Sequence, residues 1–68
     1  MREFHLTSEY IELVKLLKLL KIAETGGHAK MMVEEGEVYL NGIQELRKRA
    51  KLRSGDKIEI DGEIILIK

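Results

Sequence analysis

Residues 25–42, TGGHAKMMVEEGEVYLNG, most constrain what this chain can fold into, because they combine a helix start, a helix stop and a tight turn. Thr25 is a suitable N-cap, since its hydroxyl can accept a hydrogen bond from a free N–H of the first helical turn. Gly36 can end that helix in the left-handed conformation, which costs glycine little. Residues 38–40 then favour a strand, and Asn41-Gly42 suits a two-residue type I′ hairpin turn. These signals predict a helix followed by a β-hairpin.

An earlier helix is predicted from apolar residues at helical spacing within residues 11–22. Its apolar stripe comprises Ile11, Leu13, Val14, Leu16, Leu17 and Leu20. Thr7 or Ser8 can cap this helix, with Glu9 and Glu12 near its positive end, and it should stop near residues 20–23. Three lysines recur on another side, which is interpreted as a solvated face: Lys15, Lys18 and Lys21.

The helix that begins after Thr25 has its own apolar face, so we expect the two helices to pack together. Ala29, Met32 and Val33 recur there at i, i+3 and i+4. The acidic residues 34–37 follow at the far end. Carboxylates are unfavourable at a helix C-terminus, so they are expected to face solvent.

The remaining segments predict short strands. Residues 2–6 resemble an edge strand, residues 43–46 return from the first hairpin, and residues 57–61 and 63–68 flank a second hairpin at Asp61-Gly62. Residues 54–56 form a turn. The order is strand, two helices and four short strands, which predicts one α+β domain over residues 1–68: two packed helices followed by a small antiparallel sheet.

The residue types argue against a metal site, a membrane segment and an enzyme. The chain has no cysteine and only two isolated histidines, which predicts no metal and no cofactor. The N-terminus lacks the apolar core of a signal peptide, and the longest apolar stretch is interrupted by charges, so no membrane segment is expected. No Ser, His and acid arrangement indicates catalysis or a small-molecule substrate. We therefore expect a cytoplasmic protein that is not an enzyme.

Residues 47–53, RKRAKLR, are the strongest functional signal. They carry five positive charges, Arg47, Lys48, Arg49, Lys51 and Arg53. The whole chain balances twelve basic against twelve acidic residues, so these cations must be segregated from the acidic residues at 34–37 and 56–63. Such a cluster can bind RNA phosphates by releasing counterions. Basic loops on ordinary domains are common, and both interpretations stay open at this point.

The helix start at Thr25 offers a second anion-binding feature. Gly26 and Gly27 would let a phosphate approach the N–H groups that point out of the helix, although a plain turn between helices explains the glycines equally well. Lys30 lies one turn further on, away from the apolar face. His28 could touch a base or a phosphate, or be an ordinary exposed histidine.

The aromatic residues offer no stacking platform of the kind that proteins binding single strands use. There are three, Phe4, Tyr10 and Tyr39, and all are expected to be partly buried in the core.

The chain resembles a known family. The pattern LLKLLKIAETGGHAKMMVEEGEVYLNG followed by KLRSGDKIEI resembles the "S-four" RNA-binding domain, named after ribosomal small-subunit protein four. The TGG-AK spacing in a bare single domain is similar to its small stand-alone bacterial subgroup, called YaaA- or YbcJ-like. The resemblance covers residues 10–60.

The resemblance implies the alpha-L RNA-binding motif fold and binding of structured, ribosomal or transfer RNA. The implied RNA-binding positions are Thr25, Gly26, Gly27, His28, Lys30, Arg47, Lys48, Arg49, Lys51 and Arg53, with Val38, Asn41 and Gly42 shaping the adjacent hairpin. Many members carry an arginine where this chain has Gly26, which shifts the expected contacts to backbone N–H groups and Lys30.

Two other classes remain alternatives to a non-catalytic, ribosome-associated RNA-binding module. Val38-x-x-Asn41-Gly42 and the Gly55-Asp56 turn also resemble a β-grasp carrier protein, but the sequence ends in Leu66-Ile67-Lys68 without the diglycine that such carriers activate. A protein-interaction adaptor would use the apolar face of the first helix, or the last strand as a free edge. The residues alone do not identify the RNA or the oligomeric state.

Overall fold

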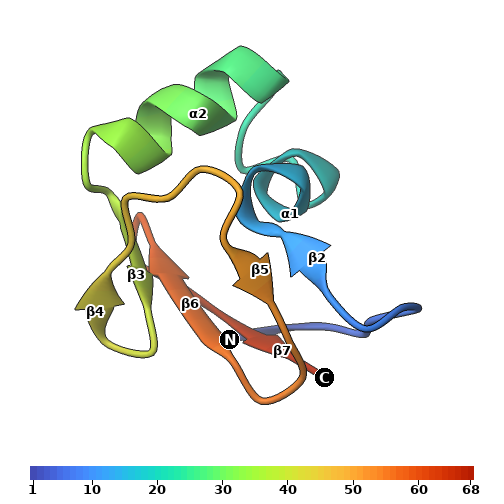
Figure 1. Ribbon diagram of the computed structural model, residues 1–68. Coiled ribbons are helices and arrows are strands. Elements are labelled where there is room, and N and C mark those ends of the chain that lie inside the picture. Colours follow the sequence, from blue (N-terminus) through green and yellow to red (C-terminus); the bar gives the residue numbers. More distant parts are fainter.

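The computed structural model describes all residues 1–68 (Figure 1). In chain order the elements are β1 (Arg2–Phe4), β2 (Ile11–Glu12), α1 (Leu13–Leu19), α2 (Gly26–Glu34), β3 (Val38–Leu40), β4 (Ile43–Gln44), β5 (Lys51–Leu52), β6 (Lys57–Ile60) and β7 (Glu63–Ile67). The two helices contact each other, and both lie at one end of the strands. The predicted α+β class is confirmed.

Five strands form the main sheet in the order β1-β7-β6-β3-β4. Its last four strands are antiparallel, as predicted, while β1 is an edge strand that pairs parallel to β7. Because β7 lies between β1 and β6, the last strand is not a free edge. That part of the adaptor interpretation is wrong.

A second, two-stranded sheet was not predicted. It pairs β2 with β5, with Ile11 opposite Leu52 and Glu12 opposite Lys51. The predicted order of strand, two helices and four strands therefore misses both of these short elements. Each is only two residues long and depends on a partner far away in sequence, so local pattern carries little information about it.

The start of α1 differs from the prediction for a physical reason. Neither Thr7 nor Ser8 caps it, since the helix begins at Leu13, and the N-cap residue Glu12 makes no side-chain cap bond. Backbone carbonyls of the basic segment accept from the first turn instead. The N–H of Leu13 donates to Ala50 O at 2.9 Å and that of Val14 to Lys48 O at 3.3 Å. This tertiary cap satisfies N–H groups that a helix leaves unpaired, and it fixes residues 48–50 against α1.

Both ends of α2 are as predicted. The Thr25 hydroxyl accepts from the His28 N–H at 3.0 Å. At the other end Gly36 has φ +78°, and the N–H groups of Gly36 and Glu37 donate to Val33 and Met32. This is the Schellman pattern of a left-handed helix end.

The first hairpin and the later Gly-Asp turn are joined through side chains. Asn41 and Gly42 both have positive φ, 51° and 85°, as a type I′ turn requires. The Asn41 amide donates to Asp56 at 3.0 Å and accepts from the Lys57 N–H at 2.9 Å. Asp56 in turn accepts from the Arg53 N–H at 2.8 Å. The Asn-Gly and Gly-Asp signals therefore belong to one bonded unit.

The core lies between the helices and the sheets. The predicted helix contacts are confirmed, because the largest buried side chains include leucines of α1, Val33 of α2 and isoleucines of β6 and β7. Fully buried members are Leu13, Leu16, Leu17, Ala29, Val33, Val38, Leu52, Ile58 and Ile65. Lys15, Lys18 and Lys21 are exposed, as expected for a solvated face. Neither helix has the length and apolar character needed to cross a membrane.

Candidate nucleic-acid interface

The basic segment at residues 47–53 is held in place by its own apolar residues. Ala50 and Leu52 are buried, at 3% and 0% exposure, while the residues between and beside them are exposed. Alternation of this kind places successive side chains on opposite faces. Lys51 and Arg53 therefore share the outer side of a backbone whose inner side is fixed in the core, and Arg49, in the turn just before it, is exposed as well.

Arg47 forms an ion pair with the neighbouring carboxylate of Glu45. Its Nε and Nη2 donate to the two oxygens of Glu45, each at 3.0 Å, and its backbone N–H donates to the same side chain at 3.0 Å. The hydrogen bonds from Arg47 hold the pKa of the buried Glu45 carboxyl below its ordinary value, against the opposing effect of burial. The same pair raises the pKa of Arg47. Arg47 therefore contributes little uncompensated charge.

Lys48 is also paired, with Glu34 at 3.6 Å. Arg49, Lys51 and Arg53 make no ion pair, and neither does Lys30. Glu34 was expected to face solvent, and it is exposed, but it also forms an ion pair with the basic segment. The five predicted cations thus divide into two that pair with carboxylates and three that make no ion pair.

A shallow open hollow lies among the basic side chains. It has a volume of about 370 Å³ and is lined by Arg47, Arg49, Ala50 and Lys51. Of its four lining residues, Arg49 and Lys51 are cations without an ion-pair partner, so the hollow suits an anion rather than an apolar group.

The start of α2 presents free N–H groups beside two glycines that the fold does not need. A Cβ on Gly26 would meet nothing within 4 Å, and one on Gly27 would only touch the Thr25 hydroxyl at 3.9 Å. Neither residue has positive φ. Glycine in a helix interior costs about 1 kcal/mol relative to alanine, and packing within the protein does not require glycine at either position.

His28 has a local role at the same helix start. Besides donating its N–H to Thr25, it accepts at Nδ1 from the Glu24 N–H at 3.4 Å. Its ring is therefore held against the turn before α2 while the side chain remains exposed. Lys30 is exposed, and Ala29 and Val33 on the opposite side are buried, as the spacing predicted.

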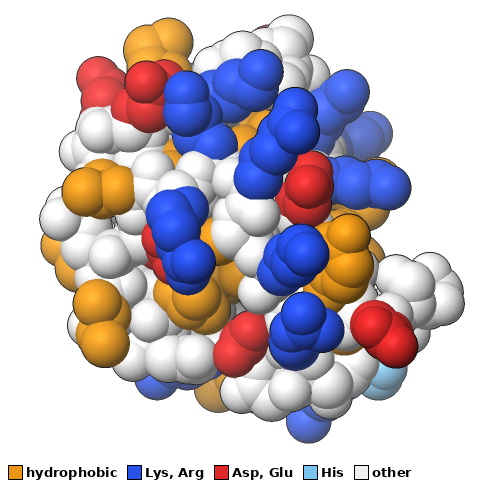
Figure 2. All heavy atoms as spheres, viewed as in Figure 1, with side chains coloured by type: hydrophobic (Ala, Val, Ile, Leu, Met, Phe, Trp, Pro, Cys, Tyr) orange, Lys and Arg blue, Asp and Glu red, His pale blue; other side chains and the backbone are white.

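The structure does not bring the two halves of the predicted site onto a single anion. Lys48 contacts Glu34 at the end of α2, whereas Gly26 is its first residue. Gly26 and Glu34 are eight residues apart, which corresponds to about 12 Å along the helix axis. Figure 2 shows Lys and Arg side chains over α2, over the segment that leads into β5 and over β5 itself, all on the face in view. The candidate interface is therefore a band, not a pocket.

The expectation that the tyrosines are partly core residues is wrong. Tyr10 is 36% exposed and Tyr39 is 42% exposed, while Phe4 is half-buried as expected. The Tyr10 ring lies against the free cations, 4.9 Å from Lys51 Nζ and 5.6 Å from Arg53 Cζ. The sequence did not predict this place for Tyr10, because the apolar stripe predicted for the first helix begins at Ile11. The structure instead has a short strand at Ile11–Glu12 before α1 begins at Leu13.

No three His, Cys, Asp or Glu side chains come together in a geometry that could hold a metal ion.

Comparison with known proteins gives consistent matches. The S4 domain family model matches residues 4–68, a wider span than residues 10–60. The Escherichia coli (strain K12) protein YbcJ, named as a candidate RNA-binding protein, is 36% identical over 58 residues, covering 85% of this chain and 83% of that protein. RlbA of Bacillus subtilis (strain 168), named as a candidate ribosome maturation protein, is 40% identical over 55 residues, covering 81% of this chain and 78% of that protein.

A solved structure matches over nearly the whole chain. The solution structure of Escherichia coli YbcJ, described as having an alpha-L motif involved in RNA binding, superimposes with a TM-score of 0.73. It is 35% identical and covers 98% of this chain and 86% of that one. The expected alpha-L fold and the resemblance to the YbcJ-like subgroup are confirmed.

Proposed function

This chain belongs to the S4 domain family, and from that premise we propose that it is an RNA-binding module that acts on structured ribosomal RNA without catalysing a reaction. The module would contact phosphates through the start of α2 and through the basic segment at residues 47–53. RNA would be its partner, with no cofactor and no small-molecule substrate.

The observation that carries this proposal is the placement of Arg49, Lys51 and Arg53. They are unpaired cations on the outer side of a segment whose inner residues are buried. Arginine forms bidentate contacts with phosphate, and each neutralised phosphate releases counterions. A fixed row of cations reduces the conformational entropy that binding must overcome.

The start of α2 supports the same partner. Its N–H groups and dipole favour an anion, and its two glycines leave them open to close approach. Lys30 supplies the nearby charge in place of the arginine that many family members carry before it. Structured RNA fits a band with contacts about 12 Å apart, because its phosphates are held at fixed separations.

Ribosomal RNA is the favoured class because the Bacillus subtilis relative is named as a candidate ribosome maturation protein. The E. coli relative is named for RNA binding. A ribosomal partner places the proposed activity in the cytoplasm.

The test is titration of the protein with a structured ribosomal RNA fragment at several salt concentrations. We compare the native chain with a triple variant, Arg49→Gln, Lys51→Gln and Arg53→Gln. The variant should bind more weakly, and the slope of log K against log salt should fall by about 2 to 3 if each cation contacts one phosphate. Its fold should persist, because all three side chains are exposed.

The matched control replaces three exposed cations of the α1 region with glutamine: Lys15, Lys18 and Lys21. It changes the net charge equally, so it corrects for long-range attraction. Equal losses in the two variants would show that the basic segment is not the contact surface. Absence of salt-dependent RNA binding by the native chain would refute the proposed function.

A further inference from the structure

The two-stranded sheet has one buried face and one exposed face. Ile11 and Leu52, which lie opposite each other, are buried at 8% and 0% exposure. Continuing the same ladder by one residue places Tyr10 opposite Arg53. Because side chains alternate along a strand and opposite residues share a face, Tyr10 projects from the outer face together with Arg53.

The same outer face carries Glu12 and Lys51, which lie opposite each other in the ladder. It therefore presents two cations, one carboxylate and one aromatic ring. The ring contacts both cations, at 4.9 Å from Lys51 Nζ and 5.6 Å from Arg53 Cζ. The two cations outnumber the one carboxylate, so this face has a net positive charge and would attract an anion.

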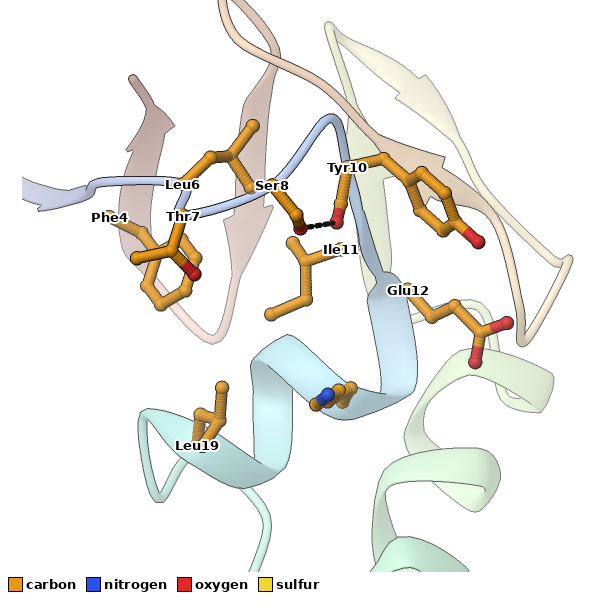
Figure 3. Close-up of a pocket in the computed structure, with 9 residues that line it drawn as sticks. Phe4, Leu6, Thr7, Ser8, Tyr10, Ile11, Glu12 and Leu19 are labelled. Carbon is orange, nitrogen blue, oxygen red and sulfur yellow. Dashed lines mark hydrogen bonds between the residues drawn. The ribbon is translucent and has the colours of Figure 1, made fainter.

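Tyr10 is not a member of the hydrophobic core cluster. It borders an open hollow of about 460 Å³, whose mixed apolar and polar lining also includes Phe4, Ile11 and Leu19. In Figure 3 the Tyr10 ring points away from that hollow, although its backbone carbonyl accepts from Ser8 Oγ at 3.0 Å. The tyrosine hydroxyl has no hydrogen-bond partner in the protein.

We propose that Tyr10, with Lys51 and Arg53, is a stacking site for an unpaired nucleotide of the bound RNA. The base stacks on the Tyr10 ring, and its flanking phosphates lie against Lys51 and Arg53. This inference rests on the proposed RNA-binding function and adds to it a preference for RNA with an unpaired segment next to a structured one. Aromatic rings and arginine planes stack on bases of any sequence, so the site selects unpaired structure and not a sequence.

The first experiment measures affinity for two RNA probes: a paired hairpin, and the same hairpin with a short tail of unpaired adenosines. The native chain should prefer the tailed hairpin. Tyr10→Leu should lower affinity for the tailed hairpin roughly five- to hundredfold, the range measured for loss of one stacked base, and leave the paired hairpin nearly unchanged. Tyr10→Phe should retain the preference, because it keeps the ring.

The chain offers a matched control in Tyr39→Leu. Tyr39 is similarly exposed, on β3, and makes no cation–π contact. Its replacement should leave both affinities unchanged. Thermal unfolding of each variant shows whether a loss of affinity is only a loss of fold.

The second experiment observes the ring directly. The chain has two tyrosines and no tryptophan, so in a Tyr39→Phe protein all tyrosine emission comes from Tyr10. Stacking of adenine on the ring should quench this emission when the tailed hairpin binds, and the paired hairpin should quench it much less. A Tyr10→Phe protein, whose only tyrosine is Tyr39, should show little change with either probe.

The outcomes separate the two proposals. Binding of both hairpins with equal affinity and no tail-dependent quenching would overturn the stacking site and leave the RNA-binding function intact. Equal losses for both probes in Tyr10→Leu would also overturn it, since they would show that Tyr10 only positions Lys51 and Arg53. Failure of the native chain to bind either hairpin or a ribosomal fragment would overturn both.

Discussion

Replacing Gly26 and Gly27 together with alanine should make the protein more stable and worse at binding RNA. Both positions have room for a Cβ and neither has positive φ. Alanine stabilises a helix by about 1 kcal/mol relative to glycine at interior positions, and less at the first turn. We expect a total gain of about 1 kcal/mol, which raises the Tm of a domain this size by roughly 4–8 °C.

Affinity should move in the opposite direction. The added methyl groups would restrict the close approach of a phosphate to the N–H groups that we propose bind it. Loss of one hydrogen bond to a charged group costs about 1.5–3 kcal/mol, which corresponds to a roughly ten- to hundredfold weaker complex. Thermal unfolding measures the first effect, and titration with a structured ribosomal RNA fragment measures the second.

The control is Gly42→Ala at the hairpin turn. Gly42 also has open space around it, but its φ is +85°, so alanine there is strained. This variant should have a lower Tm and an unchanged affinity while it is folded. Alanine at both helix-start positions with a raised Tm and native affinity would refute the idea that these glycines exist for close approach. A lowered Tm would show that they are needed for the fold.

Three further predictions follow from contacts elsewhere in the chain. Glu45→Gln should lower the Tm at neutral pH. Arg47 holds the pKa of folded Glu45 below its ordinary 4.5, so the stabilisation by this pair is present above that value and is lost as the pH falls through the folded pKa. The difference in Tm between the two proteins should therefore vanish in acid. Lys21→Gly should raise the unfolding free energy by about 0.5–1 kcal/mol in chemical denaturation, since Lys21 ends α1 with φ +60° and non-glycine residues are strained there; an unchanged value would contradict this account. Asn41→Ala and Asp56→Ala should each destabilise the protein. In a double-mutant cycle their coupling energy should be about 1 kcal/mol, because the two side chains form a hydrogen bond. Unfolding free energies that simply add would show that this hydrogen bond does not stabilise the protein.

Local signals predicted the elements that depend on few residues. Thr25 and Gly36 bound α2 because a cap and a left-handed stop are properties of one turn of chain, and the hairpins at Asn41-Gly42 and Asp61-Gly62 follow from two residues each. The start of α1 could not be predicted in this way. Its cap comes from carbonyls of Lys48 and Ala50, which no sequence near the helix reveals.

The candidate site was predicted in composition but not in geometry. The five cations at residues 47–53 were identified, yet two of them form ion pairs with Glu45 and Glu34, and the second of these partners lies on another element. One usable signal was overlooked. Residues 49–53, RAKLR, alternate charged and apolar side chains, which is a strand pattern within what looked like a loop.

That alternation explains how a chain with zero net charge can present a basic surface. Burial of Ala50 and Leu52 directs Arg49, Lys51 and Arg53 outward, and carbonyls of the same segment cap α1. The residues that hold the core together therefore also fix the backbone that carries the cations, so little backbone freedom of the segment remains to be lost on binding. Destabilising the α1 cap should thus weaken RNA binding even where no charge is removed, a coupling that a flexible basic loop would not show.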